Sequence, residues 1–186
     1  DNPLAAKTIE STPARNPLAA DTTARTEVEL GVFIKIDVGL HRCGVDPASA
    51  APVELAWQII SAPGLDFRGI LSHAGQVYAV ESRHAAVEMA EAERETMLQV
   101  RDRLIEHDIA VPEISVGATP TILAAPGFAG ITEIRPGNYA FLDLLPIKVG
   151  VVTNEAVSLS VLATVISKNA DFFITDAGSK TLTSDT

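Results

Sequence analysis

The chain repeats one local pattern four times: a short apolar segment of strand length runs directly into a polar loop that contains glycine. The apolar segments are Val32–Ile36, Phe67–Ser72, Pro112–Val116 and Gly130–Ile134. Apolar, β-branched runs of this length are typical of buried strands, and glycine gives the following loop backbone angles that other residues avoid. The pattern therefore favours a fold in which polar groups gather where buried strands end.

Two helical segments separate the first three of these strands. Pro52–Ile60 is apolar, and the longer segment Arg83–His107 carries apolar side chains on one face: Val87, Ala90, Met97 and Leu104. Strands that alternate with helices predict parallel βαβ units, that is, an α/β fold. Ligands of such folds bind beyond the carboxyl ends of the strands, so we expect the four loops to share one rim.

The length of the chain limits how much of such a fold it can contain. A complete (β/α)8 barrel of TIM type takes about 250 residues, whereas this chain has 186, of which 47% are hydrophobic. Only four or five barrel strands can be counted. We therefore expect the later strands of a (β/α)8 barrel, from the middle part of a longer protein.

Residues after about 150 follow a different pattern. Apolar and polar side chains alternate over Val157–Val165, and the strand-like segment Phe172–Asp176 follows with no helix between them. A period of two predicts strands, which we expect to pair antiparallel. The predicted domains are a partial barrel over residues 1–150 and the start of a β-rich domain over residues 151–186.

Composition excludes several classes of partner. The formal net charge of −10 argues against nucleic acid or an anionic membrane, since both bind clustered Lys and Arg. No signal peptide is visible, and no apolar run approaches the roughly 20 residues of a membrane helix. The single cysteine, Cys43, excludes an internal disulfide, so we expect a cytoplasmic protein. Cys43 receives no catalytic role, because no neighbouring motif needs a nucleophile.

Five motifs, in this order, resemble the pyridoxal-phosphate (PLP) enzymes of the alanine-racemase-like barrel type, fold type III. They are IKIDVGLHRCGV, GILSHAGQVY, SVGATPT, TEIRPGNYAFLD and the closing SVLATVIS…DAGSKTLTSD. The resemblance is to the D-threonine aldolase and D-serine dehydratase branch in particular. It implies a PLP-binding barrel followed by a β-rich C-terminal domain, which agrees with the pattern of strands.

The resemblance also gives the loops a chemical purpose. A phosphate dianion binds backbone N–H groups of glycine-flanked turns together with a hydroxyl, and the loops after the third and fourth strands offer both. By resemblance, Thr119, Gly137 and Asn138 hold the cofactor phosphate. Arg135 would face the pyridine nitrogen, which it can hydrogen-bond without giving up a proton.

Four further residues receive roles from the resemblance. Arg42 would approach the phenolic oxygen of the cofactor, and His73 would lie close to the ring or to the pyridine-facing Arg135, so both are catalytic candidates. Tyr78 and Tyr139 are expected to contact the cofactor or its phosphate. If these roles are right, five residues should converge at one mouth of the barrel: Arg42, His73, Thr119, Arg135 and Gly137.

The residues alone leave simpler roles open. His73 could be a structural histidine beside an apolar strand, and Arg42 a loop arginine bound to carbonyl groups. Arg135 could form an ion pair with Glu133 or Asp143. For each tyrosine, ordinary packing is an equal alternative, and each glycine loop alone could be a turn before a helix.

The sequence departs from the family pattern in two respects. Gln76 stands where the family commonly has histidine, which puts an acid–base role there in doubt. The lysine that binds PLP covalently lies on the first barrel strand in this family, and no lysine here has a matching context. The family's divalent-metal ligands lie near the end of the β domain, so no metal ligand is assigned within this chain.

These expectations define the function implied by the resemblance. It is a PLP-dependent D-amino-acid lyase of the D-threonine aldolase or D-serine dehydratase type, which acts on β-hydroxy D-amino acids with a divalent metal. We expect the whole protein to be a homodimer whose partner is a small amino-acid substrate. Three alternatives remain: an amino-acid racemase, a non-catalytic PLP-binding barrel, and an α/β scaffold without a ligand.

Overall fold

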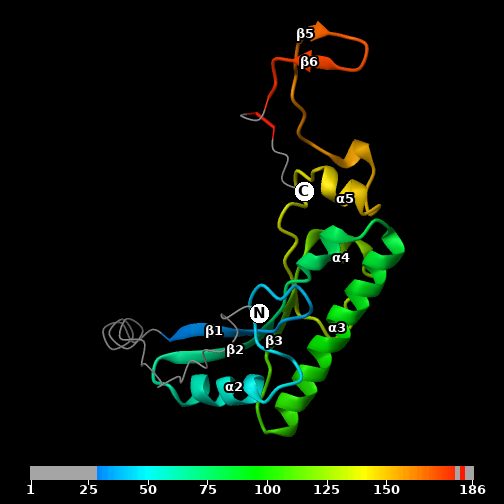
Figure 1. Ribbon diagram of the computed structural model, residues 1–186. Helices are drawn as coiled ribbons and strands as arrows, with labels where there is room; N and C mark the ends of the chain where they lie inside the picture. Colours follow the sequence, from blue (N-terminus) through cyan, green and yellow to red (C-terminus); the bar gives the residue numbers. More distant parts are fainter. Residues whose placement is uncertain (1–28, 179–180, 183–186) are drawn as a thin grey trace, which may run out of the picture.

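A four-stranded parallel sheet forms the centre of the molecule. The computed structural model describes residues 29–178 and 181–182, so the first 28 residues of the predicted barrel domain lie outside the described part. The strands follow one another in chain order: β1 (Leu30–Lys35), β2 (Leu65–Leu71), β3 (Glu113–Val116) and β4 (Glu133–Ile134). Helix α2 (Ala51–Ser61) connects β1 to β2, and α3 (Arg83–Glu106) lies between β2 and β3 (Figure 1). This alternation confirms the expected α/β fold with part of a parallel barrel.

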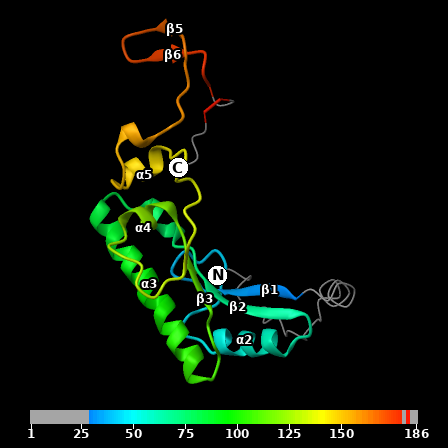
Figure 2. The same ribbon diagram turned by 180° about the vertical axis from the view of Figure 1, so that it is seen from behind.

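The hydrophobic core lies between the sheet and these two helices. Viewed from behind, α2 runs beside β2, whereas the longer α3 runs at a steep angle to β1 and β2 (Figure 2). The apolar face predicted for Arg83–His107 is confirmed, because Ala90, Met97 and Leu104 are buried. Burying such apolar area is the main force that holds helices on a sheet. The core joins residues of the sheet, of both helices and of the segments next to them: Ile34, Ile36, Ala56, Phe67, Ile70, Met97, Val100, Leu104, Ile109, Ile114 and Val116.

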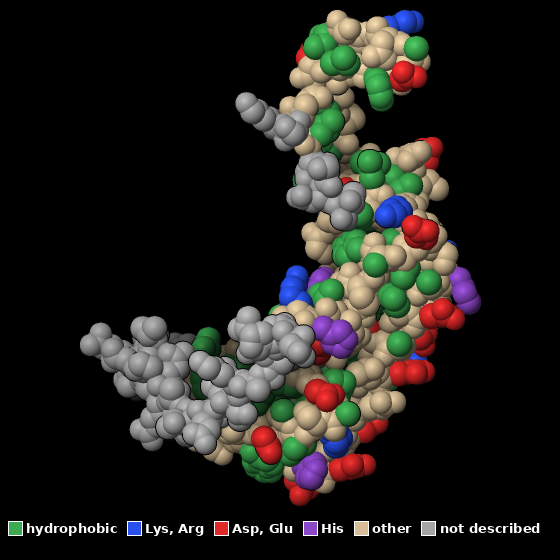
Figure 3. All heavy atoms as spheres, viewed as in Figure 1, with side chains coloured by type: hydrophobic (Ala, Val, Ile, Leu, Met, Phe, Trp, Pro, Cys, Tyr) green, Lys and Arg blue, Asp and Glu red, His purple; other side chains and the backbone are tan. Residues whose placement is uncertain are grey.

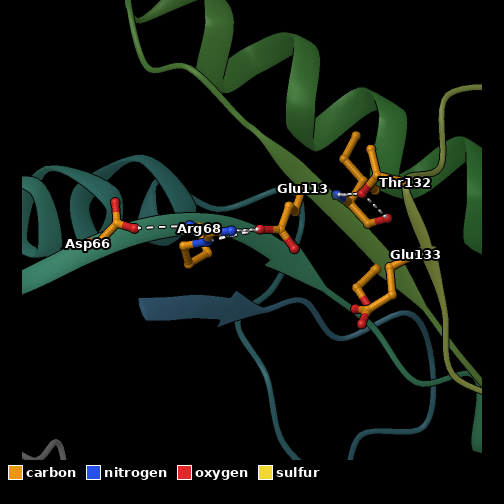
Figure 4. Close-up of polar contacts among 7 residues, drawn as sticks. Asp66, Arg68, Glu113, Thr132 and Glu133 are labelled. Atoms are coloured by element: carbon orange, nitrogen blue, oxygen red, sulfur yellow. Dashed lines mark hydrogen bonds and ion pairs between the residues drawn. The ribbon is translucent and has the colours of Figure 1, made fainter. Parts of the chain in front are cut away.

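A bulge in β2 sets the register of the sheet. Val32 pairs with Phe67 and Phe33 with Gly69, so Arg68 is left as the extra residue. Gly69 has a φ of +141°, and a Cβ there would lie 1.9 Å from the carbonyl oxygen of Glu113. The freed Arg68 side chain donates from Nε to Glu113 at 2.9 Å and pairs with Asp66 on its own strand (Figure 4). Glycine is therefore required where β2 and β3 approach each other.

Short elements follow the strand ends. The 3-10 helix η1 (Gly75–Ala79) comes after β2, and α4 (Thr119–Ala124) comes after β3. After β4 come α5 (Leu144–Lys148) and the 3-10 turn η2 (Asn154–Ala156). The chain then forms an antiparallel hairpin of β5 (Val165–Lys168) and β6 (Phe173–Thr175), which is set apart from the sheet (Figure 1).

The hairpin confirms one expectation and corrects another. Two strands without an intervening helix do pair antiparallel, as predicted for the segment after residue 150. The alternating segment Val157–Val165, however, is not a strand, since only its last residue belongs to β5. Its apolar side chains lie exposed, Leu159 at 71% and Leu162 at 100%. A strand needs a neighbour to accept and donate its backbone hydrogen bonds, and no described segment lies beside residues 157–164 in a sheet.

Candidate functional site

The loops that follow β1, β2, β3 and β4 share one edge of the sheet. Because the strands are parallel and adjacent, their carboxyl ends lie together. Two side-chain contacts tie neighbouring loops: Gln76 donates from Nε2 to the carbonyl of Val38 at 2.8 Å, and His73 Nδ1 lies 2.5 Å from the carbonyl oxygen of Gly117. The expected shared rim is therefore present.

His73 is held in one orientation by the loop after β3. A carbonyl oxygen only accepts, so Nδ1 of His73 is the nitrogen that donates to Gly117. Its Nε2 has no hydrogen-bond partner among the described residues. Because Nδ1 is already bonded, Nε2 is the nitrogen left for a ligand. Gly75 lies against this ring: a Cβ there would lie 2.9 Å from Nε2 of His73 and 2.9 Å from Cδ2 of Leu40, so there is no space for a side chain.

Arg135 bridges the carboxyl ends of β2 and β3. It donates from Nε to the hydroxyl of Ser115 at 2.7 Å and from Nη2 to the carbonyl of Ser72. The same Ser115 hydroxyl donates to the Glu133 carboxylate, so Arg135 reaches that carboxylate through a serine. Figure 4 shows Glu133 on the strand next to Glu113. The simple ion pairs considered for Arg135 are absent from the described residues, where neither Glu133 nor Asp143 contacts it directly.

The two loops expected to hold phosphate are also in contact. The backbone N–H of Asn138 donates to the Thr119 hydroxyl at 3.2 Å, and Nδ2 of Asn138 donates to Asp143 at 3.0 Å. Asp143 in turn caps α5 by accepting from Leu145 N at 2.8 Å. A Cβ added to Gly137 would meet nothing within 4 Å, so the backbone at this point faces open space.

Tyr78 lies next to this contact. Burial raises the pKa of its hydroxyl, and the negative charge of Asp143 raises it further, while hydrogen bonding to Thr119 acts in the opposite direction. The phenol is therefore neutral and can donate to an acceptor near Thr119. Tyr139, by contrast, is 65% exposed, and no described side chain bonds to its hydroxyl.

The loop after β1 is ordered by a residue that the sequence analysis did not select. The Asp37 carboxylate accepts from the backbone N–H groups of Gly39 and His41, both at 3.0 Å, and lies 3.0 Å from Nδ1 of His41. These contacts hold the pKa of Asp37 below its usual value, the N–H of Gly39 contributing most. Arg42 is exposed on this loop and makes none of the contacts that join the other candidates.

The structure thus brings together His73, Tyr78, Thr119, Arg135 and Asn138, with Gly137 beside them, and leaves Arg42 and Tyr139 on the exposed rim. Ser72 and Ser115, both fully buried, complete the cluster but were missed from sequence. Ser72 follows an apolar run at a strand end and Ser115 interrupts one. Many serines without a functional role occur at such positions, so the sequence alone does not distinguish these two.

The rest of the described surface offers few other sites. Among residues 29–178 and 181–182, no three His, Cys, Asp or Glu side chains are grouped so that they could hold a metal ion. No helix in the described part is long and apolar enough to cross a membrane. On the face in Figure 3, acidic side chains run along the α3 edge while the few Lys and Arg lie apart from one another.

Known proteins are similar to this chain in sequence. Residues 10–144 match the family model for the alanine racemase N-terminal domain. D-threo-3-hydroxyaspartate dehydratase of Delftia sp. strain HT23 is 39% identical over 173 residues, which cover 91% of this chain and 45% of that protein. D-serine dehydratase of Dictyostelium discoideum is 32% identical over 163 residues (83% and 41%), and D-threonine aldolase of Arthrobacter sp. is 32% identical over 165 residues (84% and 42%).

A solved structure shows the same fold. D-threo-3-hydroxyaspartate dehydratase from Delftia sp. HT23 superimposes with a TM-score of 0.79 at 36% identity, over 89% of this chain and 44% of that one. The chain spans less than half the length of the curated relatives it matches. The sequence motifs, the parallel sheet and these matches agree: the chain belongs to the alanine racemase N-terminal domain family, within its D-amino-acid dehydratase and aldolase relatives.

Proposed function

We propose that the protein containing this chain is a PLP-dependent lyase that acts on β-hydroxy D-amino acids. The observation that carries the proposal is the position of Arg135, which is fixed by Ser115 and Ser72 at the edge where His73 and Thr119 also lie. The named relatives act on D-threo-3-hydroxyaspartate, D-serine and D-threonine, all of which are amino acids with a β-hydroxyl.

The residues present fit the cofactor. PLP needs donors for its phosphate, and the open backbone at Gly137 and the Thr119 hydroxyl are two such groups at one place. The N–H of Asn138 donates to the Thr119 oxygen, which leaves the hydroxyl proton of Thr119 to face the phosphate. The ring nitrogen of PLP needs a partner, and no described group accepts from Nη1 of Arg135. When bound, PLP supplies an electron sink for the bond broken at the substrate α-carbon.

The chain's own side chains would bind and orient the cofactor, and one of them would move a proton. Arg135 would donate to the ring nitrogen and keep its proton, since guanidinium does not lose a proton in proteins. His73 would exchange a proton at Nε2, because Nδ1 is committed to Gly117. Tyr78 would donate to the phosphate beside Thr119, and Arg42 would reach the cofactor oxygen from the exposed rim.

Four further assignments belong to the same proposal. The barrel ends and a β-rich domain begins near residue 150. This assignment is supported by the β5–β6 hairpin, which is antiparallel and separate from the parallel sheet. A divalent metal is bound by residues other than those described. The whole protein acts as a homodimer on a small amino-acid substrate, without nucleic acid or membrane. It is cytoplasmic, consistent with the single cysteine.

The test uses the full-length protein with PLP and a divalent metal. A dehydratase releases ammonia and a keto acid from D-serine or D-threo-3-hydroxyaspartate, whereas an aldolase releases glycine and acetaldehyde from D-threonine. Either product supports the lyase. Interconversion of alanine enantiomers without these products would establish a racemase instead, and PLP binding without turnover of any substrate would establish a carrier.

A further inference from the structure

Glu93 is the only charged side chain that is buried among the described residues. It lies on α3 and is 4% exposed. Ser72 donates its hydroxyl to Oε1 of Glu93 at 2.6 Å, and the Thr121 hydroxyl lies 3.4 Å from Oε2. Burying a carboxylate is costly unless it is hydrogen-bonded, and two hydroxyl groups are few partners for that cost. An alanine or leucine at this position would avoid the cost of burying a carboxylate, so the presence of Glu93 indicates a role other than packing.

The first partner leads to the ring-nitrogen side of the candidate site. Ser72 accepts from Arg135 through its carbonyl and donates to Glu93 through its hydroxyl. The bond to Glu93 therefore fixes the same residue that holds Arg135. The next residue in the chain is His73, whose Nδ1 is bonded to Gly117.

The second partner leads to the phosphate side. The Thr121 hydroxyl is 3.0 Å from the carbonyl oxygen of Ala118 and is shared between that carbonyl and Glu93. Ala118 directly precedes Thr119, whose own hydroxyl accepts from Asn138 N. Glu93 thus lies behind the first turn of α4 as well as behind the end of β2.

We propose that Glu93 is a positioning residue that sets the separation between Arg135 and the Thr119 loop. The inference rests on the proposed function, because a rigid cofactor presents its ring nitrogen and its phosphate at a fixed distance. Two protein groups that bind such a molecule must be held at a matching distance, since misplacement of either one loses binding. Glu93 does not touch the cofactor; it acts through Ser72 and Thr121.

The first measurement needs no cofactor. In the full-length protein without PLP, Glu93→Ala should speed amide hydrogen exchange in residues 72–74, 117–121 and 135–138. Glu93→Gln should leave exchange near the wild-type rate, because the glutamine oxygen still accepts from Ser72 and its amide can donate to Thr121. Glu95→Gln is the matched control, an exposed carboxylate on the same helix.

The second measurement is PLP affinity, followed by the absorption of the bound cofactor. Glu93→Ala should weaken PLP binding about tenfold or more, the usual cost of losing a group that orients a ligand-binding side chain. The absorption maximum should shift, since the ring nitrogen no longer meets Arg135 in the same place. Glu93→Gln should restore both, whereas a purely structural role would lower stability without moving the spectrum of the folded fraction.

The outcomes separate this inference from the proposed function. The inference is overturned if Glu93→Ala leaves exchange unchanged in the three segments and keeps PLP affinity within about twofold of wild type. If Glu93→Ala does not fold, Ser72→Ala and Thr121→Val each break one branch, and each should speed exchange only in its own branch; equal effects on both would contradict the proposal. If the wild type does not bind PLP, the proposed function fails, and the exchange data still decide the role of Glu93.

Discussion

Arg135 is the residue on which the candidate site depends most. Two of its nitrogens are bonded to groups at the ends of β2 and β3, so these contacts tie its position to the sheet. A fixed guanidinium differs from a lysine ammonium, which offers a single charged centre without the planar fork. The contribution of Arg135 should therefore depend on its shape as well as on its charge.

Arg135→Lys tests this dependence in the full-length enzyme. Lysine keeps the charge but cannot bond Ser115 and Ser72 while it also reaches the ring nitrogen, so kcat should fall about 100-fold. Arg135→Glu should lower the rate further, because a carboxylate would favour a protonated ring nitrogen. Arg101→Lys, at an exposed pair with Asp102, is the control and should stay within about twofold. A lysine variant as active as the control would remove Arg135 from the site.

Asp37 gives a pH-dependent prediction. Its pKa in the folded protein is lowered, chiefly by the N–H of Gly39, so its contribution to stability is present above the unfolded pKa and is lost as pH falls. Asp37→Asn should lower the free energy of unfolding by about 1 kcal/mol at pH 7. The difference from wild type should begin to shrink below about pH 4, where the carboxyl of the unfolded chain becomes protonated, and should continue to shrink as pH falls toward the lower pKa of the folded protein. Urea unfolding at pH 7 and pH 3.5 measures both values, and a difference that does not change with pH would contradict the assignment.

Residues of the site could be predicted from sequence only where they follow a recognisable motif. His73, Thr119, Arg135 and Asn138 stand in glycine-flanked loops, and the structure brings them together. Ser72, Ser115 and Glu93 were missed, because their importance comes from contacts between elements distant in the chain. Glu93 has the helical spacing that places it on the same buried face as Ala90 and Met97. A charged residue at such a position was the one feature of the sequence that could have identified it.

At the scale of elements, periodicity predicted what a segment buries but not what it pairs with. Both helices and the four parallel strands were predicted within a few residues of their bounds. Both helices and β1 to β3 contribute buried apolar side chains to one core, whereas both residues of β4 are exposed. The alternating residues 157–164 satisfied the same pattern without a neighbouring strand. Alternation predicts a strand only where a partner supplies the hydrogen bonds.

The bulge in β2 makes an element-scale prediction. Gly69→Ala would place a Cβ 1.9 Å from the Glu113 carbonyl oxygen at a positive φ, so β2 and β3 must separate. We expect a loss of about 2–3 kcal/mol in the free energy of unfolding. Gly127→Ala, where a Cβ meets nothing within 4 Å, is the control. Equal stability of the two variants in denaturant unfolding would mean that the register of β2 and β3 is not fixed by Gly69.

On the scale of the whole molecule, apolar side chains lie exposed beyond the parallel sheet. Tyr139, Phe141, Leu144, Phe172 and Phe173 are each 65% exposed or more. Exposed apolar patches promote association. The 186-residue chain expressed alone should therefore self-associate, as sedimentation velocity would show, and Phe173→Ser should reduce the association. A monomer at all concentrations would contradict this expectation.

Metal removal distinguishes cofactor binding from catalysis in the whole enzyme. The proposed cofactor residues, Arg135, Thr119, Gly137 and Asn138, bind without any metal ligand, and the described residues contain no metal-binding group of three. If the proposed metal polarises the β-hydroxyl, chelation should abolish the reaction at that hydroxyl while the absorption of bound PLP remains. Activity should return when a divalent metal is added back. Full activity on D-serine or D-threonine in the presence of chelator would show that the hydroxyl leaves or is deprotonated without metal, and would transfer that role to a protein side chain such as His73.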